Sequence, residues 1–185
     1  MTGDLWIFGY GSLMWKPGFE PLETVRARVD GVHRAPCVLS HVHRGTPERP
    51  GVVLGLDRGG SCEGLAMRVA GAARVEVMRY LRGREQVTMV YLERTVRAHL
   101  IDGRVVEAVT YVVDRAHAQY AHALPLSELL ERIVGAAGRS GENPDYFRET
   151  ARRMRELGIR DDLVERIAER LGPGGAPTEV AARPV

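Results

Sequence analysis

The alternation of hydrophobic and polar positions predicts strands in the first part of the chain. An apolar and aromatic run over residues 5–10 is closed by glycines, which predicts a buried strand that ends in a tight turn. Runs rich in β-formers predict the next strands, and glycines and prolines over residues 44–51 predict a loop. Turn residues at 57–61 predict a break between the last two strands. The predicted strands are residues 5–10, 32–42, 52–56 and 63–69.

The middle of the chain predicts one helix followed by a β-hairpin. Apolar residues recur at helical spacing within residues 72–85. Beyond them, residues 91–101 and 104–113 flank Asp102-Gly103, a dipeptide preferred in two-residue hairpin turns because both positions tolerate positive φ. We therefore expect two antiparallel strands joined at this dipeptide.

The remainder of the chain has helical patterning. The predicted helices are residues 126–137, 143–158 and 162–171. Residues 173–185 are rich in Pro, Gly and Ala and have little to bury, so we expect a flexible C-terminal tail after one domain of residues 1–172. Strands grouped early and helices grouped late indicate an α+β protein rather than a doubly wound sheet.

The charge pattern argues against nucleic acid as a partner. The 26 basic and 24 acidic residues leave a net charge of +2 and are interspersed, whereas a phosphate backbone needs a clustered basic stripe. Lys16 is the only lysine, so Schiff-base chemistry and P-loop phosphate binding have a single candidate residue. The excess of arginine over lysine fits the codon usage of a GC-rich bacterium.

Cysteine usage and the first residues indicate the cytoplasm. Cys37 and Cys62 are isolated and lack CxxC spacing, and a chain of 185 residues does not need a disulfide, so we expect reduced core thiols. The first residues lack a basic segment followed by an apolar run, and no segment approaches the length of a membrane span. We expect a soluble cytoplasmic protein, a monomer, with no membrane partner.

The glycine turn from Gly9 to Leu13 is the first candidate site. It superficially resembles a dinucleotide-binding turn, but the third glycine is missing and no amphipathic helix begins there. Glycines also let a backbone approach a small anion, with the N–H groups of Gly11, Ser12 and Leu13 directed at a carboxylate or an oxyanion. A strand that ends in a type II or bulged turn without any ligand is the alternative that this motif leaves open.

Glu85 is the second candidate. It lies four residues after Leu81, seven after Met78 and eight after Val77, so on a helix it points the same way as this apolar stripe. Burial there would raise the pKa of the carboxyl toward the range useful for moving protons near neutral pH. The alternative is that the helix ends at Gly83 and that Glu85 is solvated or pairs with a neighbouring arginine.

Four short segments, in this order and spacing, resemble those of the ChaC-like gamma-glutamylcyclotransferases. They are FGYGSLMW at residues 8–15, HRG at 43–45 with Pro50-Gly51 following, YLRGRE at 80–85, and SGENPDY at 140–146. The resemblance extends from about residue 5 to residue 170. The sequence departs from the family at residues 86–90, QVTMV, where smaller, glycine-containing residues are usual. This departure bears on substrate fit and not on Glu85.

The resemblance implies a small closed mixed β-barrel surrounded by helices, in which the glycine turn and Glu85 meet at one cavity. It also implies a reaction. The free α-amine of a γ-glutamyl group attacks its own γ-carbonyl, which for glutathione gives 5-oxoproline and cysteinylglycine. Attack within one molecule needs neither a metal nor another cofactor, and one proton carrier is enough. Two alternatives stay open: a cyclotransferase for other γ-glutamyl peptides or amines, and a noncatalytic module that binds γ-glutamyl compounds.

The resemblance also assigns candidate site residues. Glu85 is expected to be the catalytic acid/base. The residues expected to bind the substrate are Gly9, Tyr10, Gly11, Ser12, Leu13, Met14, Arg44 and Tyr146. Arg44 offers a guanidinium fork for the glycine carboxylate of glutathione. Asn143, which precedes Pro144, is interpreted as a helix cap.

Other polar residues carry weaker hypotheses. His41 and His43 have the spacing of one strand face, and His33 lies eight residues before His41, but no HExxH or nearby ligand run supports a metal site. We interpret these histidines as surface strand residues and expect no metal. Ser12 and Ser140 lie in no GxSxG elbow and are discounted as nucleophiles.

Overall fold

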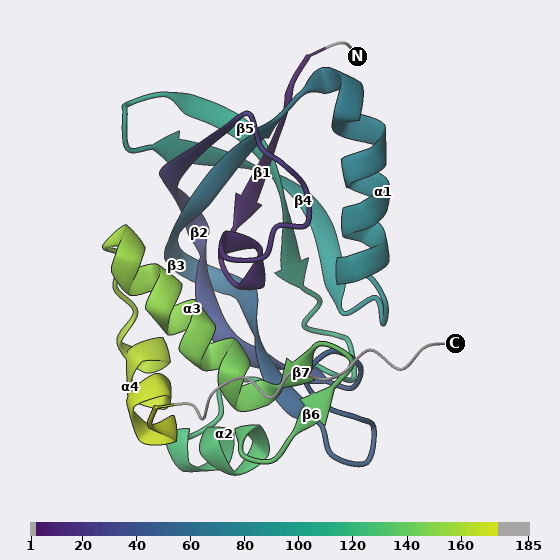
Figure 1. Cartoon of the computed structure of the whole chain (residues 1–185), viewed down its shortest axis with the longest axis vertical. Helices are drawn as coiled ribbons and strands as arrows, with labels where there is room; N and C mark the ends of the chain where they lie inside the picture. Colours follow the sequence, from purple (N-terminus) through teal and green to yellow (C-terminus); the bar gives the residue numbers. More distant parts are fainter. Residues whose placement is uncertain (1–2, 174–185) are drawn as a thin grey trace.

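The computed structural model describes residues 3–173, which form a closed β-barrel with helices packed around it (Figure 1). The barrel strands are β1 (Leu5–Gly9), β2 (Glu23–Ser40), β3 (Gly51–Val69), β4 (Tyr91–Leu100) and β5 (Val105–Val113), hydrogen-bonded in the order β1-β3-β2-β4-β5. These neighbours pair antiparallel, and a parallel pairing of β1 with β5 closes the barrel. The predicted α+β class and mixed barrel are therefore confirmed. The predicted tail lies, apart from Pro173, outside the described residues.

The long strands β2 and β3 bend around the barrel with a bulge between them. The predicted break at residues 57–61 is wrong, because β3 is continuous there. Gly59 and Gly60, with φ of 95° and 69°, lie opposite Gly31, with φ of 82°, and the register of the two strands shifts at this point. Glycine adopts these left-handed conformations without steric cost, so the turn-forming residues bend a strand instead of ending it.

The hairpin of β4 and β5 is confirmed, with a connection of different geometry. Residues 101–104 join the two strands, and among them only Gly103 has positive φ, at 91°. The Gly103 N–H donates to the Leu100 carbonyl at 3.0 Å, which closes the turn. The connection is thus a longer turn followed by one left-handed glycine, rather than a two-residue turn.

The helices occupy two sides of the barrel (Figure 1). They are α1 (Arg74–Glu85), preceded by the 3-10 turn η2 (Gly71–Ala73), then α2 (Leu126–Ile133), α3 (Asn143–Leu157) and α4 (Asp162–Leu171). The predicted helix over residues 126–137 is too long, because Ala137 already belongs to a short ladder of β6 (Ala137–Gly138) and β7 (Gly141–Glu142). No helix within residues 3–173 has the length and apolar content needed to cross a membrane.

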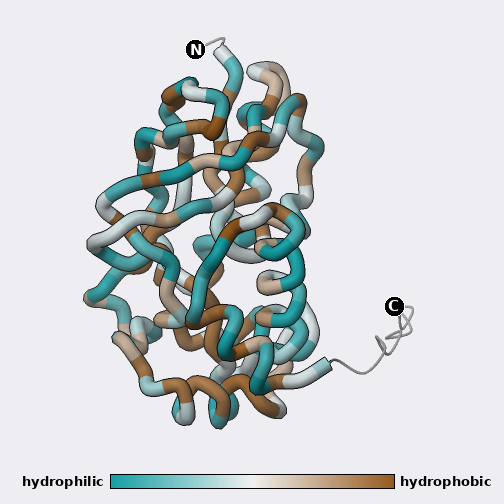
Figure 2. The backbone as a smooth tube through the Cα atoms, turned by 90° about the vertical axis from the view of Figure 1, so that its left-hand side faces the viewer, coloured by the Kyte–Doolittle hydropathy of each residue, from teal (hydrophilic) through white to brown (hydrophobic). Residues whose placement is uncertain are grey.

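The core fills the barrel and the space beneath the helices. Hydrophilic and hydrophobic positions alternate along much of the chain (Figure 2), while β1 is buried at three successive positions. Ile7 and Phe8 of β1 are completely buried, as is Phe147 of α3. Cys37 and Cys62 are buried free thiols, as expected from the sequence.

Candidate active site

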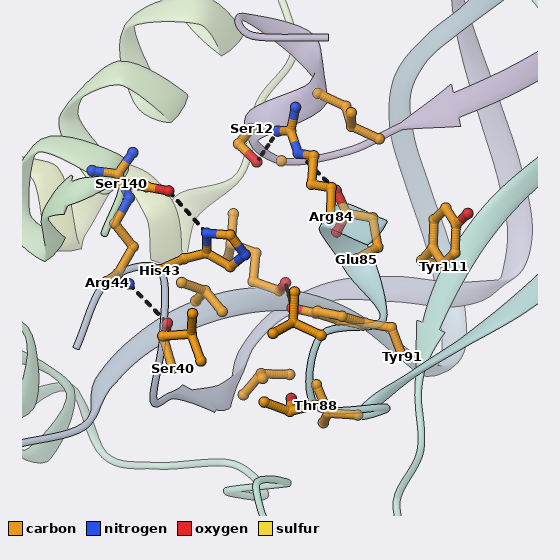
Figure 3. Close-up of a pocket in the computed structure, with 18 of the residues that line it drawn as sticks. Ser12, Ser40, His43, Arg44, Arg84, Glu85, Thr88, Tyr91, Tyr111 and Ser140 are labelled. Carbon is orange, nitrogen blue, oxygen red and sulfur yellow. Dashed lines mark hydrogen bonds and ion pairs between the residues drawn. The ribbon is translucent and has the colours of Figure 1, made fainter. Parts of the chain in front are cut away.

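A cavity of about 690 Å³ opens between the end of β1, the end of α1 and the segment that follows β2 (Figure 3). Its volume lies within the range of sites for small molecules. The polar or aromatic residues in its wall include Tyr10, Ser12, His43, Arg44, Arg84, Glu85, Tyr91, Tyr111, Ser140 and Tyr146. The structure therefore brings the predicted glycine turn, Arg44, Glu85 and Tyr146 to one cavity.

The turn after β1 continues into a single 3-10 turn, η1 (Ser12–Met14). The Met14 N–H donates to the Gly11 carbonyl at 3.0 Å, which turns the chain tightly. In the part of the chain that the structure describes, the N–H groups of Gly11, Ser12 and Leu13 donate no hydrogen bond. These three residues all line the cavity. Their N–H groups are thus available to an anionic or polarised oxygen of a ligand.

The two glycines of this turn are closely packed, so a side chain at either position would need its neighbours to shift. A β-carbon on Gly9 would lie 3.0 Å from the Leu13 β-carbon and 3.0 Å from the Met67 methyl group. A β-carbon on Gly11 would lie 3.0 Å from the Tyr146 hydroxyl. Gly9 and Met14 were also expected to bind the substrate, but neither lines the cavity. Their role is to support the turn from behind.

A buried arginine, Arg34, holds the turn in place. Its Nε donates to the Tyr10 carbonyl at 2.7 Å, and its Nη1 lies 3.1 Å from Oδ2 of Asp161. The Arg34 side chain is only 3% exposed, so its charge depends on these partners. No sequence pattern predicts this role of Arg34, because nothing in the sequence links it to residues 10 and 161.

Glu85 is the last residue of α1 and points into the cavity, as its spacing predicted. Val77, Met78 and Leu81 are buried beneath it. The Glu85 side chain is 17% exposed. Burial raises the pKa of its carboxyl above the ordinary value, while the positive charge and the hydrogen bond of Arg84 act in the opposite direction. A carboxyl in this environment can exchange protons closer to neutral pH than a solvated glutamate.

Arg84 joins the end of α1 to the glycine turn. Its Nε lies 3.0 Å from Oε1 of Glu85, and its Nη2 donates to Oγ of Ser12 at 2.9 Å. Its Nη1 donates to the Lys16 carbonyl at 2.6 Å. Pairing of Glu85 with Arg82 or Arg84 was the alternative to a carboxyl that faces the core, and the structure combines the two: Glu85 lines the cavity and pairs with Arg84. In the structure this arginine fixes the carboxylate relative to the turn.

Tyrosine hydroxyls surround the inner part of the cavity and are all hydrogen-bonded. Tyr10 donates to the Tyr111 carbonyl at 2.9 Å, and Tyr91 donates to the Leu54 carbonyl at 2.7 Å. Tyr146 accepts from the Leu54 N–H at 3.2 Å. Burial raises the pKa of Tyr146 to about 12 and raises the pKa values of Tyr10 and Tyr91 as well. These phenols stay protonated near neutral pH, so none of them serves as the base.

Arg44 lies at the outer part of the cavity, buried against two aromatic rings. Its guanidinium carbon is 5.9 Å from the ring centroid of Trp15 and 5.6 Å from that of Tyr146. Nη1 donates to the Glu142 carbonyl at 2.9 Å. This arrangement fixes the orientation of the guanidinium, so a carboxylate can bind to it without a large loss of side-chain entropy.

Asn143 does not cap α3, contrary to the interpretation of the sequence. Its side chain accepts from the Val52 N–H at 2.7 Å and donates to the Val52 carbonyl at 2.7 Å. No side chain caps the start of this helix. Asn143 therefore fastens α3 to the beginning of β3, and this pairing also positions Tyr146 one turn later.

His33 lies in strand β2 as predicted, but His41 and His43 differ from the prediction. His41 and His43 follow the end of β2 at Ser40, so they do not belong to a strand, and both line the cavity. Within residues 3–173, no group of His, Cys, Asp or Glu side chains has an arrangement suited to a metal ion.

Comparisons with known proteins agree with this geometry. The family model described as "ChaC-like protein" matches residues 5–172. A glutathione-specific gamma-glutamylcyclotransferase of Escherichia coli is 35% identical over 160 residues, which cover 86% of this chain and 69% of that protein. Glutathione-specific gamma-glutamylcyclotransferase 1 of Mus musculus is 33% identical over 91% of this chain and 78% of its own. A crystal structure of a gamma-glutamyl cyclotransferase specific to glutathione from yeast has a TM-score of 0.82 at 22% identity, covering 91% of this chain and 95% of that one.

Proposed function

The chain belongs to the ChaC-like protein family, and from this premise we propose that it is a glutathione-specific gamma-glutamylcyclotransferase that converts glutathione to 5-oxoproline and cysteinylglycine. The observation that carries the proposal is the meeting of Glu85 with the glycine turn in one cavity, with Arg84 bonded to both. Intramolecular cyclisation needs a proton carrier and a site for oxygen charge, and these two elements supply them.

The γ-glutamyl end of the substrate lies between Glu85 and the turn in this proposal. The reacting atoms must reach the Glu85 carboxyl, because proton transfer requires hydrogen-bond distance. The N–H groups of Gly11, Ser12 and Leu13 then bind the α-carboxylate or the developing oxyanion, and the leaving dipeptide extends toward Arg44. The Arg44 guanidinium receives the glycine carboxylate.

The charges of the cavity suit an anionic substrate. Its ionisable side chains other than histidine and tyrosine are Lys16, Arg44, Arg79, Arg84, Glu76 and Glu85. Glutathione carries two carboxylates and one ammonium near neutral pH, so it complements a cavity in which cations outnumber carboxylates.

Glu85 moves the protons of the reaction. As a carboxylate it removes a proton from the α-ammonium, and the freed amine attacks the γ-carbonyl carbon. A C–N bond forms as the γ-amide bond breaks, and protonated Glu85 gives its proton to the departing nitrogen. The attacking nitrogen still carries one proton more than a lactam does, and the ionised Glu85 moves this second proton to the released amine, so the products are the uncharged lactam nitrogen of 5-oxoproline and the ammonium of cysteinylglycine. The proton count is balanced without a co-reactant. Because nucleophile and electrophile belong to one molecule, holding the substrate folded supplies much of the rate acceleration.

The experiment that tests this function supplies purified protein with glutathione alone. Chromatography should detect 5-oxoproline and cysteinylglycine in equal amounts, and the activity should survive dialysis against a chelator. Formation of free glutamate and cysteinylglycine would instead indicate hydrolysis, and a loss of activity restored by a divalent metal would contradict the proposed chemistry.

The cellular setting is also part of the proposal. We propose a bacterial cytoplasmic enzyme that acts as a monomer, with one catalytic domain over residues 1–172. The free thiols of Cys37 and Cys62 are compatible with a reducing compartment. Sedimentation of the full chain would test the monomer.

A further inference from the structure

A second cavity begins where the outer end of the active-site cavity lies. Its volume is about 790 Å³, and it runs from Arg44 and the β6–β7 turn along α3 to Gly172 after α4. Figure 3 shows Arg44 and Ser140 together at one edge of the active-site cavity, away from Glu85. The residues that line both cavities are Trp15, Lys16, Arg44 and Ser140. This outer groove therefore continues the active site on the far side of Arg44.

A small residue leaves room beside Arg44 at this junction. Gly141 lines the outer groove and has φ of 99°, a left-handed conformation that favours glycine. A β-carbon on Gly141 would lie 3.4 Å from Nη1 of Arg44, so a longer side chain would reach the guanidinium. Nη1 donates to the Glu142 carbonyl, and within residues 3–173 Nε and Nη2 of Arg44 donate no hydrogen bond. These two donors are available to a ligand that passes through the junction.

The far wall of the outer groove is fixed by Arg148 of α3. Its Nε donates to the Gly172 carbonyl at 2.9 Å, and its Nη2 donates to the Leu171 carbonyl at 2.9 Å. These carbonyls lie at the end of α4, where backbone acceptors have no partner within the helix. Arg148 thus fixes the position of the end of α4 relative to α3, and the two helices form the walls of the groove.

The outer groove has five cationic and three acidic side chains. The cationic ones are Lys16, Arg44, Arg148, Arg152 and Arg155, and the acidic ones are Asp145, Glu149 and Glu169. Each of the three α3 arginines pairs with a carboxylate, at 2.9, 2.6 and 2.5 Å. In the part of the chain that the structure describes, Lys16 and Arg44 have no carboxylate partner. The two unpaired cations line the junction, where they can bind an anionic group of a ligand.

We propose that the outer groove binds the leaving group of γ-glutamyl peptides that continue beyond glycine, and that Lys16 binds the carboxylate of the added residue. The inference rests on the proposed function, in which Arg44 receives the glycine carboxylate of glutathione. In a longer peptide this carboxylate is an amide, whose carbonyl still accepts from Arg44, and the added residue enters the groove. The chemistry is unchanged, so γ-Glu-Cys-Gly-X gives 5-oxoproline and Cys-Gly-X.

Elongated analogues of glutathione test the groove directly. The purified full-length protein is supplied with glutathione, γ-Glu-Cys-Gly-Glu or γ-Glu-Cys-Gly-Lys, and mass spectrometry measures 5-oxoproline and the released peptide. We expect kcat/KM for the acidic peptide within about 10-fold of that for glutathione and about fivefold or more above that for the basic peptide. Turnover of glutathione without turnover of either longer peptide would overturn the inference and leave the proposed function intact. Equal turnover of the two longer peptides would overturn the role of Lys16.

A charge reversal inside the groove provides a second test. Arg152 lines the outer groove but not the active-site cavity, and its side chain is 55% exposed, so the fold should tolerate Arg152→Glu. This variant should raise KM for γ-Glu-Cys-Gly-Glu about fivefold more than KM for glutathione. Arg166→Glu makes the same change in net charge at an exposed position of α4 outside the groove, and it should affect both substrates alike. A parallel effect of Arg152→Glu on both substrates would contradict the groove.

The single lysine gives a readout that does not need turnover. Reductive methylation with carbon-13 formaldehyde labels Lys16 and the α-amine of the chain, and methylation keeps the charge of the lysine. In Glu85→Gln, saturating γ-Glu-Cys-Gly-Glu should shift the Lys16 resonance more than γ-Glu-Cys-Gly-Lys does. A Lys16 resonance that did not move would overturn its role as the carboxylate partner. If the unaltered enzyme failed to cyclise glutathione, the proposed function would fail, while this spectrum would still decide whether Lys16 binds the longer peptide.

Discussion

Nε of Arg84 lies 3.0 Å from Oε1 of Glu85. Burial raises the pKa of the Glu85 carboxyl, and the nearby Arg84 lowers it. The two effects on this pKa oppose one another, and burial is the larger. The other end of the Arg84 guanidinium donates to Oγ of Ser12. Arg84 thus affects both the acidity of the Glu85 carboxyl and its position relative to the glycine turn.

Removal of the Arg84 charge should move the acidic limb of the pH profile. Glu85 must be ionised to accept a proton, and Arg84 lowers its pKa, so Arg84→Gln should shift the acidic limb of kcat/KM to higher pH. The measurement is a pH–rate profile. Arg82→Gln is a matched control two residues earlier on α1, because Arg82 pairs with Glu93 instead. An acidic limb that stayed in place or moved to lower pH would refute this role of Arg84.

Glu85 should make stability depend on pH. Its pKa in the folded state is raised above the unfolded value, so its contribution to stability is fully present below the unfolded pKa and is lost as pH rises through the folded pKa. Each unit of difference corresponds to about 1.4 kcal/mol. The difference in Tm between Glu85→Gln and the unaltered enzyme should therefore change in favour of the variant as the pH rises from about 4 to about 8. Glu131→Gln, exposed on α2, is the control. A Tm difference that is constant across this range would disagree with the buried carboxyl.

Asn143 offers a test of its contact with Val52. Asparagine and aspartate cap helices about equally well, so a capping residue would tolerate Asn143→Asp. In the structure the side chain both donates to and accepts from Val52, and Asp cannot donate when ionised. Asn143→Ala and Asn143→Asp should both lower the free energy of unfolding, by about 1–3 kcal/mol for each Val52 group left unpaired. Denaturant melts measure this, and near-normal stability of Asn143→Asp would favour the cap.

The substrate should need a free α-amine and a γ-linked acyl group. N-acetylated glutathione lacks the nucleophile, and an α-glutamyl peptide places its carbonyl where cyclisation does not give 5-oxoproline, so both should be inert. Oxidised glutathione should be a poor substrate because its second half must fit beside the leaving dipeptide. Product analysis with each compound checks this. Comparable turnover of an α-glutamyl peptide would make the protein an ordinary peptidase.

Local sequence patterns predicted the elements whose structure depends mainly on residues close together in the sequence. The spacing of Val77, Met78 and Leu81 predicted both α1 and the inward direction of Glu85, and the end of α3 at Gly158 follows from its left-handed φ of 65°. The first half of β2 was missed although the buried Ala27 and Val29 alternate with the exposed Arg28 and Asp30. The alternation was present there, but the charged residues obscured it.

Contacts between distant segments could not be predicted in this way. Gly59 and Gly60 have the composition of a turn, and only their pairing opposite Gly31 makes them a bulge. The Arg34 contacts with residues 10 and 161, and the Asn143 contact with Val52, join parts of the chain that no local rule connects. The resemblance of the four segments to a known family named candidate residues from distant parts of the chain. Of these, Gly11, Arg44, Glu85 and Tyr146 line one cavity.

The central claim is that Glu85 carries the protons of the cyclisation. Glutamine has nearly the shape of glutamate and can still hydrogen-bond, but it cannot accept and return a proton near neutral pH. A general acid/base contributes about 10² to 10⁴-fold to the rate, and a sole proton carrier lies at the upper end. The decisive measurement is the release of 5-oxoproline from glutathione by Glu85→Gln beside the unaltered enzyme, with glutathione binding checked by calorimetry. We expect Glu85→Gln to be a folded protein that binds glutathione and loses about 10⁴-fold in kcat, whereas near-normal turnover by the folded variant would show that another group moves the proton.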